Sequence, residues 1–299
     1  MKTSINILLV FLFAACTSVP DERMTPYVDF PETRELTART LSLDSALFRY
    51  PYRVRVQDDK AVVLDLHGTE YFFHAFHYPG FHYLSSFGKR GDAPEEMLSA
   101  ENLRWNGNFL WTLDSNKSEL TRLGFASSGD SLLRLEAVSL DEELLRALDF
   151  VQYDDSTFII PDYSGDSRFC LVSRQGKLLH KIGTIPTTDE DALKNAHPAL
   201  AQAWRSFIDY NPRNGVLAAV TQLGEVLEIY NLKDSTHIVR IGPNGEPEFQ
   251  ISQGYGIPTG IMGFSDIQVT DSAIYVVFQG RAFKDIMQKA QQGLSLIHI

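Results

Sequence analysis

The sequence predicts an all-β fold of the β-propeller type, a ring of small antiparallel sheets, or blades, with about four strands each. Two observations support this prediction. Short apolar, β-branched and aromatic runs alternate with Gly, Asp, Asn and Ser turns, and no long pattern with a helical period competes with them. The same unit also recurs with a period of roughly 40–50 residues, which is typical of propellers.

Five copies of this unit follow one another. The first three superimpose, and each passes through an apolar strand that ends at an aspartate, namely Asp65, Asp114 or Asp162. The fourth copy has Thr221 at this place, and the fifth begins at Thr270. In the first four copies the middle strands "AVVLDL", "FLWTL", "TFII" and "VLAAV" are apolar, as expected for strands covered on both faces. We expect the three aspartates to cap tight turns rather than to act in catalysis.

The stretch "FGKRGDAPEEM" (residues 87–97) has the composition of a phosphate-binding loop. However, no helical pattern follows it, and a phosphate loop needs a helix N-terminus. A similar stretch, "IGPNGEPEF" (residues 241–249), follows the outer strand of the fourth copy. We therefore interpret both stretches as connectors from the rim of one blade to the inner strand of the next. The connector residues are Gly88, Gly91, Pro94, Gly242 and Gly245.

Residues 1–15 predict a lipoprotein signal peptide, with Lys2 at a positive start and a short apolar stretch behind it. "LFAAC" (residues 12–16) resembles the lipobox of bacterial lipoproteins, although Phe13 stands where that motif prefers Leu. The resemblance implies that Cys16 is lipidated and anchors the protein in a membrane. A secretory signal cleaved after Ala15 is the alternative. Residues 16–34 are polar and contain proline, which predicts a tether.

Taken together, the signal, the blade period and the "FGKRGDAPEE" connector resemble the TolB-like six-bladed propeller lipoproteins of Bacteroidetes. The resemblance covers most of the mature chain. It implies a six-bladed propeller in the cell envelope, anchored in the outer membrane with a periplasmic or surface location, and it implies no established activity. The acidic residues Asp21 and Glu22 close behind the lipidation site resemble surface-export signals.

The propeller is expected to span residues 35–293, and its last blade is expected to be incomplete. Only five copies are visible, and residues 38–43 are the candidate for a strand that completes a blade from the N-terminal side. We hypothesise that "LSLIHI" (residues 294–299) is a non-native tail, because a transposon end used in DNA library preparation encodes it. A propeller truncated at this point is expected to expose an unpaired strand edge and to aggregate.

Composition narrows the range of partners. The chain has 299 residues, 44% of them hydrophobic, which is enough for a real core. Its formal net charge of −11 argues against a nucleic-acid partner, because phosphate binding needs a clustered positive surface. There are two cysteines, and the apolar run "RFCLVS" around Cys170 predicts a buried, inert thiol.

Candidate ligand contacts lie near the inner strands, which lead into the central channel. Arg55, Arg104, Asp209 and Asp266 form a mixed-charge set that suits a polar ligand or partner. The alternative is that they are solvated channel walls.

Four histidines, His67, His74, His77 and His82, cluster in the first copy. We interpret them as packed or surface side chains, and we expect neither a metal nor a cofactor.

The stretch at residues 187–207 predicts a helical insertion capped by Thr188 and broken or restarted at Pro198. It is expected either to cover one end of the channel or to decorate the surface.

The sequence therefore predicts a lipid-anchored envelope propeller that acts as a ligand-binding or protein-interaction module, with a carbohydrate or an envelope protein as its partner. The alternative is a propeller enzyme for a carbohydrate or another small polar substrate, whose residues converge on the channel. No Ser/His/Asp elbow, metal-ligand spacing or nucleotide fingerprint is present in the sequence, so no catalytic residue is proposed.

Overall fold

The computed structural model describes residues 24–27, 30–41 and 48–291. The predicted signal peptide, Cys16 and residues 294–299 lie outside the described residues. Within the described residues, the prediction of an all-β propeller with four-stranded antiparallel blades is confirmed. Each complete blade is a meander in which consecutive strands pair antiparallel.

Four blades are complete. Blade 1 consists of β2 (Pro51–Gln57), β3 (Lys60–Asp65), β4 (Tyr71–His77) and β5 (His82–Lys89). Blade 2 consists of β6 (Asn102–Asn106), β7 (Phe109–Asp114), β8 (Glu119–Phe125) and β9 (Leu132–Ser139). Blade 3 consists of β10 (Val151–Gln152), β11 (Thr157–Pro161), β12 (Phe169–Ser173) and β13 (Leu178–Ile182). Blade 4 consists of β14 (Ser206–Asn211), β15 (Val216–Thr221), β16 (Val226–Asn231) and β17 (Thr236–Ile241).

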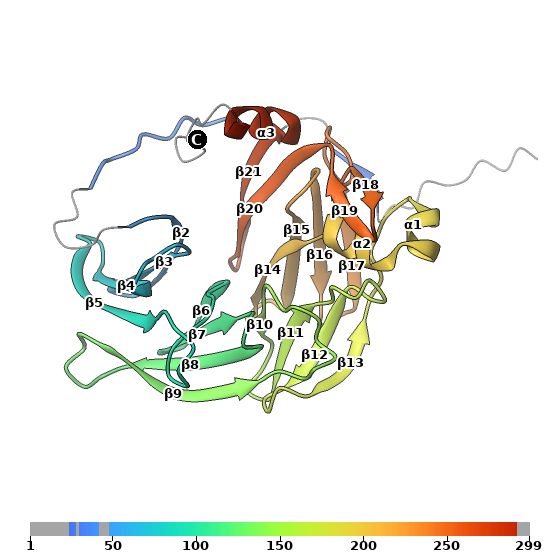
Figure 1. Cartoon of the computed structure of the whole chain (residues 1–299). Coiled ribbons are helices and arrows are strands. Elements are labelled where there is room, and N and C mark those ends of the chain that lie inside the picture. Colours follow the sequence, from blue (N-terminus) through green and yellow to red (C-terminus); the bar gives the residue numbers. More distant parts are fainter. Residues whose placement is uncertain (1–23, 28–29, 42–47, 292–299) are drawn as a thin grey trace, which may run out of the picture.

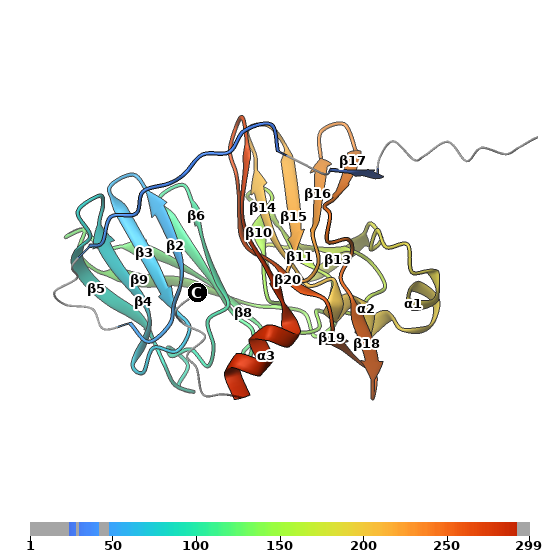
Figure 2. The ribbon, with the colours of Figure 1, turned by 90° about the horizontal axis from the view of Figure 1, so that it is seen from above.

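The blades follow one another around a common centre, with the first strand of each nearest the axis (Figure 1). After blade 4 come a hairpin of β18 (Phe249–Ser252) and β19 (Tyr255–Pro258), and then the pair β20 (Ile261–Val269) and β21 (Ile274–Ala282). The helix α3 (Phe283–Gln291) continues directly from β21. Seen from above, blade 1 and blade 4 lie on opposite sides, and α3 lies beside β20 (Figure 2).

The core lies between the blades rather than in one central layer. Leu64, Leu113, Ile160 and Val220 sit in the second strands of blades 1 to 4 and are almost completely buried. One cluster joins blades 1 and 2 through Phe73 and Leu103, and corresponding clusters join blades 2 and 3 and blades 3 and 4. These second strands are covered on both faces, which explains why their sequences are apolar without alternation.

The insertion between blades 3 and 4 forms α1 (Glu190–Asn195) and α2 (His197–Ala203), with Pro198 in the first turn of α2. The expectation of Thr188 as the cap is wrong. The Asp189 carboxylate accepts from the Ala192 N–H at 2.9 Å, because Asp189 directly precedes the first turn. Both helices pack against the outer strands of blade 4 and the β18–β19 hairpin, away from the axis (Figure 1).

The N-terminal segment contacts the propeller at its rim. The short strand β1 (Met24–Pro26), within the predicted tether, pairs parallel with the outer strand β17. Next to it the Tyr27 hydroxyl donates to Glu225 at 2.6 Å. The candidate strand at residues 38–43 is described only as far as residue 41, and residues 38–41 belong to no strand.

Candidate functional site

The inner strands β2, β6, β10, β14 and β20 bring a set of charged and amide side chains together at the axis. We call this set the channel network. It consists of Arg53, Arg55, Asn102, Arg104, Asp149, Asp209 and Asp266. Four of these residues are the channel residues expected from the sequence, and the structure brings those four together as two ion pairs.

The first ion pair connects blade 1 to β20. The two terminal nitrogens of Arg55 donate to the two carboxylate oxygens of Asp266, both at 2.8 Å. Arg53, on the same face of β2, lies 3.2 Å from Asp266 through Nε and donates to Asn102 at 2.5 Å. This face of β2 is thereby connected to both of its neighbours around the ring.

The second ion pair connects blades 2, 3 and 4. Arg104 donates to Asp209 at 2.6 Å and to Asp149 at 3.0 Å, and also to the backbone carbonyl of Ile208. Asp149 accepts from the Ile208 N–H at 3.0 Å, and Asp209 accepts from the Val269 N–H at 2.7 Å. Each carboxylate therefore connects its own blade to the backbone of the next.

Burial disfavours the charged form of each of these groups, and the oppositely charged partners counteract this effect on the pKa. Burial lowers the pKa of Arg53, and Asp266 only partly offsets this. Burial also acts against the charge on Arg104, but Asp149 and Asp209 outweigh it and raise the pKa of Arg104. For Asp266 burial acts to raise the pKa, whereas the hydrogen bond from Arg55 and the charge of Arg53 bring it below its ordinary value.

Sequence reasoning missed Arg53, Asn102 and Asp149. A signal was present, because Arg53 and Asn102 each stand two residues before an arginine of the predicted set, and alternate residues of a strand face the same side. Asp149 precedes a strand of only two residues, which is too short to produce a recognisable strand pattern around it.

Next to the channel network lies a cavity of about 880 Å³, formed by the carboxyl-terminal ends of the inner strands and the turns that follow them. Arg55, Arg104 and Asp209 belong to its wall, and Asp266 lies behind Arg55. Five aromatic residues also line it, and Trp105, Tyr153 and Tyr210 are the less buried of them; the other two are Trp111 and Phe150. The size and the mixture of apolar and polar walls are those of a small-molecule site.

The aromatic walls are held in place by neighbours. The Trp105 ring stacks on Phe125, with centroids 6.2 Å apart and planes 16° from parallel. Tyr153 of blade 3 and Tyr210 of blade 4 contact each other at 5.5 Å. The rings therefore present fixed surfaces to the cavity.

The chain matches the sequence profile of the TolB-like 6-blade propeller-like family over residues 29–299. The chain belongs to this family. The family resemblance expected from the sequence is thereby confirmed. The family is described as having six blades, and the described residues of this chain form four complete blades and the β20–β21 pair.

Two solved structures of Bacteroides proteins are similar to the chain. A putative exported protein from Bacteroides fragilis is 12% identical with a TM-score of 0.54, over 87% of this chain and 75% of that chain. A member of the DUF4221 family from Bacteroides vulgatus is also 12% identical, over 77% of this chain and 67% of that chain, with a TM-score of 0.45. No curated protein sequence matches the chain.

The aspartates of the blade repeat lie at the turns after the second strands. Asp65 is buried and accepts from the N–H groups of Arg49 and Tyr50 at 2.8 and 2.7 Å. Asp114 likewise accepts from Leu98 N–H at 2.7 Å and from the N–H groups of its own turn. Asp162 accepts mainly from the turn at residues 164–167. Asp65 and Asp114 therefore also fix the segment that enters the inner strand.

The connector after β5 leads to the strand β6, and its cations are engaged by the loop itself and by the turn between β3 and β4. Gly88 has a φ of 65°, and a Cβ there would lie 2.6 Å from the Phe73 ring. Lys89 pairs with Glu96 at 2.7 Å, and Arg90 donates to the Gly68 carbonyl at 2.9 Å. The connector after β17, which contains Gly242 and Gly245, leads to the hairpin β18–β19 before the chain returns to the inner strand β20.

The remaining candidates have local partners. His74 bonds to Ser86 at 2.8 Å, and His77 lies 3.4 Å from Asp59. Over the part of the chain that the structure describes, no group of three or more His, Cys, Asp or Glu side chains is placed to hold a metal ion. Cys170 is buried, and burial raises the pKa of its thiol to about 12. None of the described helices is long and apolar enough to cross a membrane.

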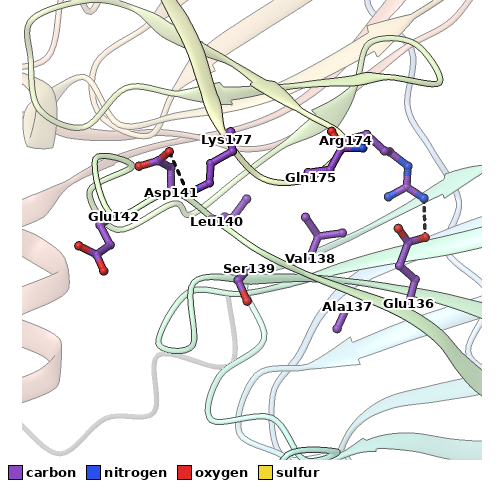
Figure 3. A pocket seen from close by; sticks show the side chains of 10 residues that line it. All are labelled: Glu136, Ala137, Val138, Ser139, Leu140, Asp141, Glu142, Arg174, Gln175 and Lys177. Carbon is purple, nitrogen blue, oxygen red and sulfur yellow. Dashed lines mark hydrogen bonds and ion pairs between the residues drawn. The ribbon is translucent and has the colours of Figure 1, made fainter.

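A second cavity, of about 810 Å³, lies at the rim between β9 and the β12–β13 turn (Figure 3). Four of its charged side chains form two pairs, with Arg174 at 2.5 Å from Glu136 and Lys177 at 3.8 Å from Asp141, whereas Glu142 points away from them. It has no aromatic ring in its lining. The axial cavity is therefore the candidate site.

Proposed function

We propose that the protein is an exported cell-envelope propeller that binds a small polar ligand in the axial cavity. The observation that carries the proposal is the division of the channel into two parts. The channel network fills one part with ion pairs that connect the blades, and the adjoining cavity is lined by fixed aromatic rings and polar side chains. A rigid floor with a concave, mixed wall is the arrangement expected of a binding site.

The network favours binding over catalysis. Both oxygens of Asp209 accept hydrogen bonds, one from Arg104 and the other from the Val269 N–H. Asp266 is similarly engaged by Arg55 and by the Ile267 N–H. These carboxylates act as connections between strands, and we assign them no proton transfer.

The proposal includes export and lipid anchoring at Cys16. Export is supported by the similarity in fold to a protein described as exported, and anchoring by the lipobox-like residues 12–16. When radiolabelled palmitate is supplied to a bacterial host, the wild-type chain should become labelled and should co-fractionate with membranes. The C16S variant should lose both the label and the membrane association. A wild-type chain found in the soluble periplasmic fraction would contradict the anchor.

Binding is tested by thermal unfolding in the presence of a mixed library of amino acids, dipeptides, nucleosides, organic acids and sugars. A ligand that binds only the folded state raises the unfolding midpoint. We expect at least one class to do so, and N106W, which places an indole at the cavity, to abolish the rise. N108W is the matched control, because Asn108 lies two residues further on, in the turn after β6, and outside the cavity lining. The proposal fails if no class raises the midpoint, or if N106W responds as the wild type does.

A further inference from the structure

The cavity carries one amide side chain at or next to the end of each inner strand. These are Gln57, Asn106, Gln152, Asn211 and Gln268. An amide both donates and accepts, so a ring of amides matches a ligand whose groups also do both. Hydroxyl groups have this property, whereas phosphate and carboxylate groups only accept.

Two polar atoms in the cavity wall are buried without a partner. Trp105 Nε1 and Gln152 Oε1 have no hydrogen-bond partner among the described residues. One is a donor and the other an acceptor, and a buried group left unpaired costs about 1–3 kcal/mol. A ligand that offers an acceptor to Trp105 and a donor to Gln152 would remove both costs.

The arginines of the wall are all engaged by carboxylates. Three arginines and three aspartates line the cavity: Arg55, Arg104, Arg213, Asp154, Asp155 and Asp209. Each of the arginines is paired with a carboxylate, Arg213 with Asp271 at 2.8 Å. The wall therefore offers no unpaired arginine to attract an anionic ligand.

We infer that the cavity takes an uncharged saccharide, with a sugar ring placed against Trp105 and its hydroxyl groups bonded to the ring of amides. A pyranose has an apolar face of C–H groups and a rim of hydroxyl groups. The face matches the fixed indole, and the rim matches the amides and the two unpaired atoms. This inference rests on the proposed function, because it names the class of ligand for the same site.

The test is isothermal titration of the purified chain with maltohexaose, cellohexaose and chitohexaose, and with hexagalacturonate and a tripeptide as comparison probes. We expect at least one of the three neutral oligosaccharides to bind. W105A should lose at least about tenfold in affinity, and W105F, which keeps a ring but not the indole N–H, should lose less. Y255A is the matched control, because Tyr255 is an exposed aromatic residue on the β18–β19 hairpin, outside the cavity.

The outcomes separate the two claims. Cavity-dependent binding of hexagalacturonate, the tripeptide or another non-saccharide, with no binding of the neutral oligosaccharides, overturns the saccharide inference and leaves the proposed function standing. If no class of ligand binds in titration or raises the unfolding midpoint, both the saccharide inference and the proposed function are overturned. Neutral oligosaccharide binding that is unchanged in W105A also overturns the inference. Circular dichroism and the unfolding midpoint, measured on W105A and W105F themselves, distinguish a loss of affinity from a loss of folding.

Discussion

The strands β15 and β21 have similar sequences and opposite surroundings. β15 reads "VLAAVT", and its residues from Leu217 to Thr221 are completely buried between blade 3 and β20. β21 begins "IYVVFQ", yet Tyr275 is 62% exposed and Val277 is 56% exposed. The same apolar pattern in the sequence predicts both strands, but among the described residues only β15 has a neighbour on each face.

The difference shows that an apolar strand in a propeller is buried by the adjacent blades and not by its own sheet. In the described part of the chain β21 pairs with β20 alone, and its two faces carry aromatic and β-branched side chains that a further blade would cover. Blade 1, at the other side of the opening in Figure 1, differs again. There Phe48 and Phe81 pack over Ala61 and Phe76, so a local aromatic cover replaces the neighbour.

The largest expected effect concerns a buried ion pair inside the covered region. Arg168 of blade 3 and Glu228 of blade 4 are both fully buried and lie 2.5 Å apart. R168A leaves a buried carboxylate without its charge partner and should lower the free energy of unfolding by about 3–5 kcal/mol in urea titrations.

The matched pair lies between blade 4 and the β20–β21 turn. Arg213 and Asp271 are 2.8 Å apart but mostly exposed. R213A should change the free energy of unfolding by less than about 1 kcal/mol, because water solvates both groups. Equal losses in R168A and R213A would mean that the two interfaces do not differ in the way described.

The next effect compares two valines directly. V220A in β15 removes two buried methyl groups from the cluster with Phe207 and Phe264, and should cost about 2 kcal/mol. V277A in β21 removes the same atoms from an exposed site and should cost less than about 0.5 kcal/mol. Urea unfolding of both variants measures the difference, and a cost at Val277 as large as that at Val220 would show that β21 is covered in solution.

The sequence predicted the blades well because each blade is a local unit. A meander of four strands, its turns and its apolar second strand are all encoded within about 50 consecutive residues. The contacts of β21 depend on what lies beside it, and no pattern within "IYVVFQ" carries that information. The sequence predicts Arg55 and Asp266 as channel residues because each lies near an inner strand. It does not predict that they pair with each other, because they are 211 positions apart in the chain.

The candidate site was predictable only in part. Strand position placed Arg104 and Asp209 at the axis, since they lie near the inner strands of their repeats. The cavity itself depends on Trp105, Tyr153 and the amides, and each amide taken alone looks like an ordinary turn residue. Only the closure of the inner strands around one axis makes five separate strand ends into one wall.

A smaller effect tests how the ring is held at β20. Because Arg55 and Arg53 keep the pKa of Asp266 below its ordinary value, its ionised form stabilises the fold. This contribution is present above the unfolded pKa of about 3.9 and is lost as the pH falls through the lower folded pKa. The difference in unfolding free energy between wild type and D266N should therefore be largest at neutral pH and shrink below about pH 4.

The control for this measurement is D92N. Asp92 is exposed in the connector after blade 1 and has no hydrogen bond or ion pair within the described part of the chain. Its substitution should leave the pH profile of unfolding as in the wild type. A wild-type advantage over D266N that stays constant from pH 7 to pH 3 would argue that the Arg55–Asp266 pair does not hold β20 in place.

The smallest effect on stability, and the most direct test of the uncovered strand, is V277K. A lysine on a flat apolar strand disfavours pairing between molecules, so this variant should remain monodisperse at protein concentrations at which the wild type scatters light. Its free energy of unfolding should stay within about 0.5 kcal/mol of the wild type, because Val277 is exposed. L133K makes the same change at an exposed leucine of β9, an outer strand in which half-buried and exposed residues alternate up to Val138, which is buried. If the exposed faces of β21 cause association, V277K should suppress it and L133K should not, and the reverse result would place the association at the rim of blade 2.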